Sequence, residues 1–259
     1  MAIIGEFNTD SGALEKRINS HEKFGSTDIN DWIFKNLEIS PALSIVDLGC
    51  GTGKQTIPMS KLVGKNGKIL SVDISQESLN TLLMKAGQTK TQNIITPLCC
   101  GLDDIHNHLN ENSFDRILSS FSLYYSQNPR NVIKTIYNSL KNGGIFFFCG
   151  PSKDNNEELK SFHNKIKGTN NSQLSGGALF MEKTGQQLAK EIFGSIDILH
   201  FENRLRFDSN EALYNYWSSY NLYDREIEND FFSEAKKHFE QNAIFETTKR
   251  VLGIKVKKQ

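Results

Sequence analysis

The sequence predicts a doubly wound α/β fold, with a mostly parallel sheet of seven strands, helices on both faces of the sheet and a helical cap inserted before the last strand. Two observations predict it. Short apolar runs alternate along the chain with amphipathic stretches of helical period. The run at residues 145–148 is apolar at every position, which is typical of a central parallel strand covered on both faces. A chain of 259 residues is long enough to form one such core.

The N-terminal region is predicted to be helical up to the first strand. In residues 12–38, apolar side chains recur at spacings of three and four, Asp28 is a suitable N-cap, and Pro41 closes the segment. Strands and helices then alternate in the manner of βαβ units. We expect strands at residues 43–48, 68–74, 93–99, 114–119 and 144–149, and helices at residues 56–63, 76–87, 129–140 and 156–167.

The C-terminal third is predicted to carry the cap. We expect a helix at residues 184–193, a long edge strand at 196–207 and the last strand at 249–257. Two helices are expected between these strands, the first beginning at Asp208 or Ser209 with Glu211 in the capping-box position. The predicted parts are an N-terminal helical lid segment (1–40), a cofactor-binding α/β domain (41–207 and 246–259) and a helical cap insertion (208–245).

Composition and charge disfavour several classes of protein. The 30 basic and 30 acidic side chains balance, whereas a nucleic-acid binder usually has an excess of Lys and Arg. No apolar run is long enough to span a membrane, and the N-terminus lacks the layout of a signal peptide. We therefore expect a cytoplasmic protein with no membrane partner. The four cysteines form no CxxC pair and no disulfide framework, which predicts reduced, structural thiols.

Two further patterns are interpreted as solvated surface. His106 and His108 could suggest a metal pair, but no third ligand stands at a matching spacing, so no metal ion is expected. Lys255, Lys257 and Lys258 form a short basic tail. We interpret that tail as the solvated end of the last strand.

The most informative segment is IVDLGCGTG at residues 45–53, where a strand runs through alternating glycines into a helix. Glycines allow the backbone to turn tightly and to approach a ligand closely. About twenty residues further on, Asp73 ends the second strand, where its carboxylate could accept from two ribose hydroxyls. This pattern predicts a nucleoside-containing ligand. Lys54 breaks the dinucleotide fingerprint and Gln55 breaks the phosphate-loop pattern, so NAD and ATP are disfavoured.

These motifs closely resemble those of class I S-adenosylmethionine-dependent methyltransferases, whose sheet is Rossmann-like. The resemblance extends to NSFDRILSSF at residues 112–121 and LKNGG at residues 140–144, and it covers roughly residues 20–155. In that family the glycine loop cradles the methionine end of the cofactor, the acidic residue binds the ribose, and the next apolar residue packs on the adenine. The resemblance therefore implies a cofactor site formed by Asp47, Gly49, Cys50, Gly51, Gly53, Asp73, Ile74, Ser119 and Ser120.

The sequence departs from the family pattern after its third and fourth strands. The family usually has an Asp that accepts from the adenine amine, but Gly101 stands at that position. Leu102, through its backbone, and Asp103, through its side chain, are the expected substitutes. Tyr124 and Tyr125 follow the fourth strand where ubiquinone-type relatives often carry His. They could contact the substrate or simply line the crevice.

The resemblance implies methyl transfer to a small-molecule metabolite by in-line displacement, with S-adenosylhomocysteine as the product. The layout is similar to enzymes of ubiquinone and menaquinone biosynthesis and to natural-product tailoring enzymes. A general base is needed only if the acceptor arrives protonated, and the candidates are Tyr124, Tyr125, His21 and His163. An RNA or protein methyltransferase and a non-catalytic cofactor-binding regulatory protein remain alternatives, as does another reaction on the same cofactor.

The predicted cap is rich in aromatic residues with polar tips. Tyr214, Trp217 and Tyr220 suit the lid of a ligand pocket, so we take them as candidate substrate contacts. The alternative is that these side chains pack the cap onto the sheet or onto a second subunit, since helical spacing alone produces an aromatic stripe. A homodimer therefore remains open.

Overall fold

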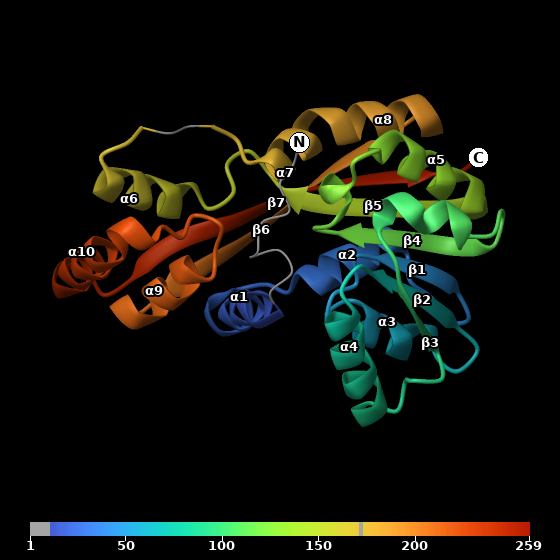
Figure 1. Ribbon diagram of the computed structural model, residues 1–259, viewed down its shortest axis with the longest axis horizontal. Coiled ribbons are helices and arrows are strands. Elements are labelled where there is room, and N and C mark those ends of the chain that lie inside the picture. The colour runs from blue at the N-terminus through green and yellow to red at the C-terminus, as the bar shows by residue number, and fades with distance from the viewer. Residues whose placement is uncertain (1–10, 171–172) are drawn as a thin grey trace.

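The computed structural model describes residues 11–170 and 173–259, which form one seven-stranded sheet with helices on both faces (Figure 1). The strand order is β3-β2-β1-β4-β5-β7-β6. The first five strands are parallel, and β7 runs antiparallel between β5 and β6. The predicted doubly wound fold is confirmed. The strands are β1 (Ser44–Leu48), β2 (Lys68–Asp73), β3 (Ile95–Cys99), β4 (Phe114–Ser120), β5 (Leu140–Pro151), β6 (Asp197–Phe207) and β7 (Phe245–Lys257).

Alternating side chains of the strands build a separate core on each face of the sheet. In β5, Phe147 points to one face while Phe146 and Phe148 point to the other, as the two-residue period of a strand requires. The first face is covered by α2 (Ile29–Leu37) and α3 (Thr56–Val63), and α4 (Gln76–Gln88) packs beside them on the loop after β1. The opposite face is covered by α5 (Pro129–Ser139), α8 (Gly185–Phe193) and the short turn η2 (Leu102–Asn107). The unbroken apolar run of β5 therefore follows from burial on both sides.

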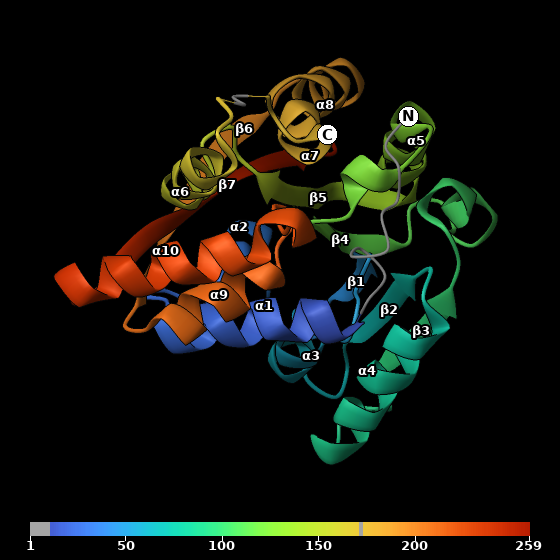
Figure 2. The same ribbon diagram turned by 60° about the vertical axis from the view of Figure 1, so that its left-hand side comes forward.

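The hairpin of β6 and β7 extends beyond the other strands and carries the cap (Figures 1 and 2). Leu205, Phe207 and Phe245 at its far end form a third apolar cluster with the cap helices. At the centre of this cluster Trp217 stacks on Phe231, with 3.9 Å between the ring centroids. The helices around the hairpin end are α1 (Ser11–Phe24), α6 (Glu157–Lys167), α9 (Asn210–Ser218) and α10 (Glu228–Gln241). Four short helical turns lie elsewhere along the chain or between these helices: η3 (Leu123–Tyr125), α7 (Gly176–Leu179), η4 (Phe180–Thr184) and η5 (Arg225–Ile227).

The N-terminal helical region is divided in two, which the sequence pattern did not indicate. α1 ends at Phe24, and Gly25 forms an antiparallel bridge with Leu205 of β6. The amides of residues 26 and 27 donate to Asn203 Oδ1 over 2.8 and 3.2 Å, which holds this connection on β6. A Cβ at position 25 would lie 2.3 Å from the backbone carbonyl oxygen of His21 and 2.5 Å from Asn203 Nδ2, so glycine is required there. Asp28 then caps α2, as predicted, by accepting from the Asn30 amide.

Two smaller expectations are corrected near the cap and the C-terminus. The first cap helix is capped by Ser209, so Glu211 is at the second helical position and no capping box forms. Lys258 is only 8% exposed, and its ammonium donates to Asn112 Oδ1 and to the carbonyls of Asn138 and Leu140. The last lysine of the basic tail is therefore a buried structural residue, not a solvated one.

Within residues 11–170 and 173–259, no helix combines the length and the apolar composition that crossing a membrane requires. All four cysteines carry free thiols. Cys50 and Cys149 are buried, whereas Cys99 is exposed and Cys100 is half-buried. Cys99 is exposed because β3 is an edge strand whose outer side chains face solvent.

Candidate functional site

The glycine loop lies at the carboxyl ends of β1 and β2, where open α/β sheets usually bind ligands. Gly49, Gly51 and Gly53 all have positive φ, at 74°, 52° and 89°. A Cβ on Gly49 would overlap the side chain of Ser122, and one on Gly53 would overlap Leu82. A larger residue would therefore meet both backbone strain and steric overlap at positions 49 and 53, and backbone strain at position 51. The amides of residues 49 and 50 donate to the carbonyl of Val72, which anchors the loop on β2.

Asp73 joins this loop to the start of α4. Its Oδ2 accepts from the Gly51 amide over 2.7 Å, and its Oδ1 accepts from the Ser75 amide over 2.9 Å. The carboxylate is half-buried, so it keeps one side toward solvent. The next residue, Ile74, is 62% exposed, which is unusual for a large apolar side chain. A carboxylate beside an exposed apolar side chain suits a ligand that has paired hydroxyls next to a flat apolar ring.

Asp47 lies beneath the loop rather than on its surface. The side chain is 1% exposed and accepts from Thr56 Oγ1 over 2.6 Å. Burial raises the pKa of Asp47 to about 7, although the Thr56 hydrogen bond opposes that change. The residue therefore supports the turn from inside. Cys50 is also buried and packs with α4.

The end of β4 faces the glycine loop. Ser119 and Ser122 share a hydrogen bond of 2.7 Å, and Ser122 also donates to the carbonyl of Leu48. Ser120 is half-buried, with its hydroxyl 3.5 Å from Cys149 Sγ. Phe121 has a φ of 58°, a conformation that is rare for a bulky residue and tends to occur at functional sites. Nothing in the sequence pattern indicated this left-handed backbone conformation at Phe121.

Tyr124 and Tyr125 form a pair on η3, with 4.6 Å between the ring centroids. Tyr124 packs close to Gly150 and Gly177, so its ring fills the space above the end of β5. Burial raises the pKa of both hydroxyls, that of Tyr124 well above its usual value. Both phenols are therefore protonated at neutral pH. They can donate hydrogen bonds, but they are poorly suited to accept a proton.

His21 on α1 has a lowered pKa, in contrast to the raised pKa values of the two tyrosines. Burial lowers the pKa of His21 well below 6.5, and the positive charges of Lys249, Lys54 and Arg17 lower it further. The imidazole is therefore neutral at pH 7. Its Nδ1 atom is buried and has no hydrogen-bond partner among the described side chains. His163 lies elsewhere, in the core of the cap, where its Nδ1 accepts from Trp217 Nε1 over 3.2 Å.

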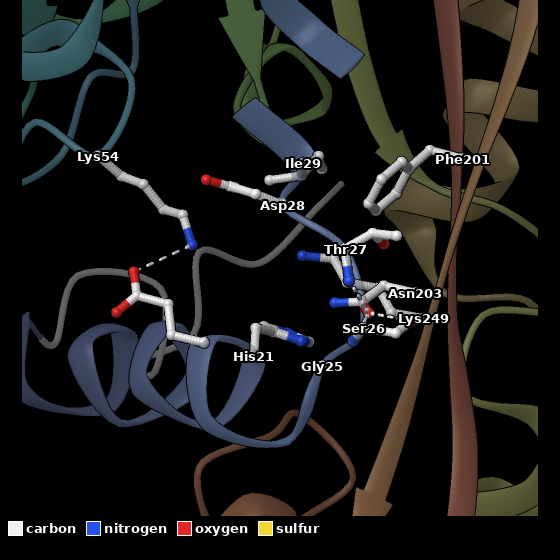
Figure 3. A pocket seen from close by; sticks show the side chains of 11 residues that line it. His21, Gly25, Ser26, Thr27, Asp28, Ile29, Lys54, Phe201, Asn203 and Lys249 are labelled. Atoms are coloured by element: carbon white, nitrogen blue, oxygen red, sulfur yellow. Dashed lines mark hydrogen bonds and ion pairs between the residues drawn. The ribbon is translucent and has the colours of Figure 1, made fainter. Parts of the chain in front are cut away.

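A pocket of about 280 Å³ opens between α1, the connection to α2, the glycine loop and the β6–β7 hairpin (Figure 3). Lys54, at the end of the glycine loop, faces His21 across it, and Lys249 and Asn203 come from the hairpin. The pocket is lined by His21, Glu22, Gly25, Ser26, Thr27, Asp28, Ile29, Lys54, Phe201, Asn203 and Lys249. Of these residues, the sequence analysis selected only His21 as a candidate site residue.

The aromatic residues of the cap mostly pack its interior. Trp217 is fully buried against Phe231, and the Tyr214 hydroxyl donates to Glu228. Tyr220 lies beside the connection after β5, where its hydroxyl accepts from Asn155 Nδ2 over 2.8 Å. In this arrangement Trp217 offers no surface to a ligand. Of the three candidate substrate contacts, Tyr220 is the one placed near the strand ends.

Asp103 is engaged with the chain that follows η3. Its carboxylate accepts from Ser126 Oγ over 2.5 Å and from the amides of residues 127 and 128. Burial alone would raise the pKa of Asp103, but these hydrogen bonds lower it below the usual value. The neighbouring Leu102 packs against the core beneath α5. A contact of Leu102 or Asp103 with an adenine amine therefore stays a prediction.

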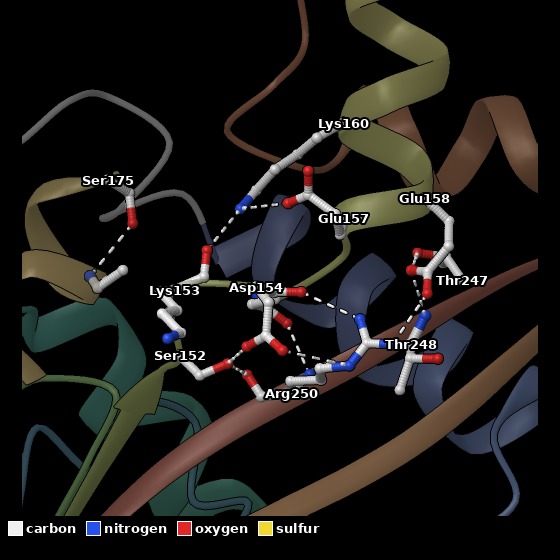
Figure 4. A network of polar contacts seen from close by, with 12 residues as sticks. Ser152, Lys153, Asp154, Glu157, Glu158, Lys160, Ser175, Thr247, Thr248 and Arg250 are labelled. Carbon is white, nitrogen blue, oxygen red and sulfur yellow. Dashed lines mark hydrogen bonds and ion pairs between the residues drawn. The ribbon is translucent and has the colours of Figure 1, made fainter. Parts of the chain in front are cut away.

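A polar network fixes the segment after β5 onto β7 (Figure 4). The Arg250 guanidinium donates to Glu158 Oε1 and to the carbonyl of Asp154, and Glu158 Oε2 accepts from the Thr248 amide. Arg250 also donates through its backbone amide to Asn155 Oδ1. These bonds hold β7, and with it the adjacent Lys249, in a fixed position relative to the end of β5.

Comparison with known proteins supports the sequence resemblance. A family model described as a methyltransferase domain matches residues 39–203, which is more than half of the chain. A demethylmenaquinone methyltransferase of Lactobacillus johnsonii is 31% identical over 134 residues, covering 51% of this chain and 54% of that protein. The chain thus spans about half the length of the curated relatives it matches.

Solved structures agree with the fold. The YcgJ protein from Bacillus subtilis superposes with a TM-score of 0.60 at 13% identity, covering 89% of this chain and 98% of that one. An S-adenosylmethionine-dependent methyltransferase from Aquifex aeolicus has a TM-score of 0.55 at 16% identity, covering 73% and 90% of the two chains. At these identities the structures support the fold alone. Together with the family match, they show that the chain belongs to the class I S-adenosylmethionine-dependent methyltransferases.

Proposed function

We propose that this protein transfers a methyl group from S-adenosylmethionine to a small-molecule acceptor by in-line displacement. The main support is Asp73, whose carboxylate lies between the glycine loop and the exposed Ile74. The family match makes S-adenosylmethionine the expected cofactor. The relative from Lactobacillus johnsonii is a demethylmenaquinone methyltransferase, which favours a small organic acceptor over a macromolecule. A cytoplasmic location and a homodimer remain predictions.

The residues around the loop fit this cofactor. Glycines 49, 51 and 53 leave backbone exposed to the methionine end, Asp73 is placed to accept from the ribose hydroxyls, and Ile74 offers an apolar surface to the adenine. Ser120, half-buried at the end of β4, would flank the sulfonium, whereas Ser119 is fully buried and supports the site through its hydrogen bond with Ser122. Asp47 and Cys50 act from beneath by holding the turn in shape.

The bound cofactor supplies a methyl group already activated on a positively charged sulfur. The chain then has to hold the acceptor atom in line with that group and keep water out, which can lower the barrier by roughly 7–11 kcal/mol. Tyr124 and Tyr125, being protonated, would donate hydrogen bonds to oxygen atoms of the acceptor. His21, being neutral, would accept a proton from a hydroxyl or ammonium acceptor.

The test is incorporation of isotope-labelled methyl groups from S-adenosylmethionine into pools of small phenolic, quinone and carboxylic compounds, with products identified by mass. We expect labelled small molecules with wild-type protein and none with Asp73→Ala at low cofactor concentration. Label found only in RNA or protein would overturn the proposal. Cofactor binding without turnover on any pool would instead favour a regulatory role.

A further inference from the structure

Lys249 is a cation that the proposed cofactor site does not use. It lies on β7 opposite Asn203 of β6, and its ammonium is 4.8 Å from the centre of the Phe121 ring. Phe121 is the strained residue directly after β4, so Lys249 reaches toward the end of the sheet where methyl transfer is proposed. The side chain is half-buried and lines the pocket. Among the described residues, no carboxylate or other hydrogen-bond acceptor pairs with this ammonium.

The charged groups around Lys249 leave its positive charge largely uncompensated. Burial lowers the pKa of Lys249 to about 7, and Lys54 and Arg17 act in the same direction. The Cys149 thiol and Asp28 act in the opposite direction without restoring the usual value. Asp28 is exposed and accepts from the Asn30 amide over 2.9 Å. A half-buried cation without a counter-ion favours binding of an anion, since an anion removes both the repulsion and the desolvation penalty.

Other groups in the pocket also suit a polar ligand. His21 presents a neutral imidazole with an unpaired, buried Nδ1. Lys54 also lines the pocket with a side chain that is 18% exposed, and its ammonium is 3.9 Å from the carboxylate of Glu22, which is 66% exposed. The two acidic residues that line the pocket, Glu22 and Asp28, are exposed, whereas Lys249 and His21 are half-buried (Figure 3). This distribution favours an anionic group that enters with its charge directed inward.

We propose that Lys249 binds a carboxylate group of the methyl acceptor at the inner end of this pocket. This inference rests on the proposed methyl transfer and adds a substrate class to it: an acid whose carboxylate pairs with Lys249 while its nucleophilic atom faces the end of β4. A carboxylate could also come from the methionine end of the cofactor. That source is distinguishable, because 5′-methylthioadenosine lacks the amino-acid end that S-adenosylhomocysteine carries.

The experiment compares wild-type protein with Lys249→Gln and with a matched control, Lys257→Gln. Lys257 is an exposed lysine of the same strand, so its replacement changes the net charge equally without touching the pocket. Benzoate and its neutral analogue benzamide are titrated into each protein saturated with S-adenosylhomocysteine. We expect wild type and Lys257→Gln to prefer benzoate by about tenfold, which corresponds to ~1.4 kcal/mol, and Lys249→Gln to lose that preference. Equal binding of both probes to wild type, or a preference retained in Lys249→Gln, would overturn the proposal.

Two further measurements identify the source of the carboxylate and exclude a structural effect. Lys249→Gln should bind S-adenosylhomocysteine and 5′-methylthioadenosine as wild type does; a selective loss for the former would assign Lys249 to the cofactor and overturn the acceptor assignment. At pH 8, benzoate binding to wild type should take up a proton, because the anion raises the pKa of Lys249, and Lys249→Gln should show no such uptake. Wild-type protein that binds neither nucleoside would contradict the proposed function instead, and the benzoate preference is then measured on the protein alone.

Discussion

The backbone amide of Gly51 donates to Asp73 Oδ2 over 2.7 Å, so the carboxylate that ends β2 directly holds the glycine loop that follows β1. Two motifs that are 22 residues apart in sequence therefore form one unit. The other carboxylate oxygen accepts from the Ser75 amide at the start of α4. Any ligand that engages this carboxylate will meet a loop whose position is already set, which reduces the entropy lost on binding.

Asp73→Ala should weaken binding of S-adenosylhomocysteine by about 1–3 kcal/mol, because ribose hydroxyls lose an acceptor and the loop loses its anchor. Isothermal titration calorimetry measures the change. Glu111→Gln, in an exposed turn, is the matched control and should bind as wild type does. Unchanged affinity in Asp73→Ala would show that this carboxylate does not contact the cofactor.

Gly49→Ala should destabilise the fold by roughly 1–3 kcal/mol, because the added methyl group overlaps Ser122 and the residue has a φ of 74°. Gly64→Ala is the control that isolates the overlap, since Gly64 has a φ of 66° but open space around a Cβ. Denaturant unfolding of both variants should show a larger decrease in the free energy of unfolding for Gly49→Ala than for Gly64→Ala. Equal losses would mean that backbone strain alone accounts for the glycine.

Asp47 should make the stability of the wild type fall as pH rises from about 4 to 7. Its pKa is raised to about 7 in the folded protein from 3.8, so its stabilising contribution is complete below 3.8 and is lost as pH rises through 7. Asp47→Asn removes this titration. The free energy of unfolding of Asp47→Asn, relative to that of wild type, should therefore increase by on the order of 1–4 kcal/mol between pH 4 and pH 8. Parallel stability curves for the two proteins would refute the assignment.

His21→Phe should reduce kcat about 10²- to 10⁴-fold with an acceptor that arrives protonated, because the neutral imidazole is the proposed proton acceptor. The pKa of His21 is well below 6.5, so activity that depends on it should be lost only at more acidic pH. His200→Gln, an exposed histidine on β6, serves as the control. A kcat for His21→Phe equal to that of wild type would leave the reaction without a base on α1.

Local patterns in the sequence were sufficient to predict the parallel sheet and the glycine loop. The alternation of strands and helices depends on side chains near in sequence, and the φ of 74° at Gly49 by itself favours glycine. The pairing of Asp73 with Gly51 was within reach because both follow adjacent parallel strands.

Features that depend on pairing with β6 and β7 could not be predicted. Gly25 interrupts the N-terminal helical region because it meets Leu205, about 180 residues later in the chain. Lys249 enters the pocket, and Lys258 is buried on the carbonyl of Leu140, only because β7 inserts between β5 and β6. From the sequence alone, both lysines are typical of a solvated strand.

The central claim is that the loop anchored by Asp73 binds S-adenosylmethionine. The most direct measurement is calorimetric titration of the purified protein with S-adenosylmethionine and with S-adenosylhomocysteine. We predict one site for each ligand with a dissociation constant on the order of micromolar, or about −8 kcal/mol. Absence of binding by both ligands at millimolar concentration would contradict the account.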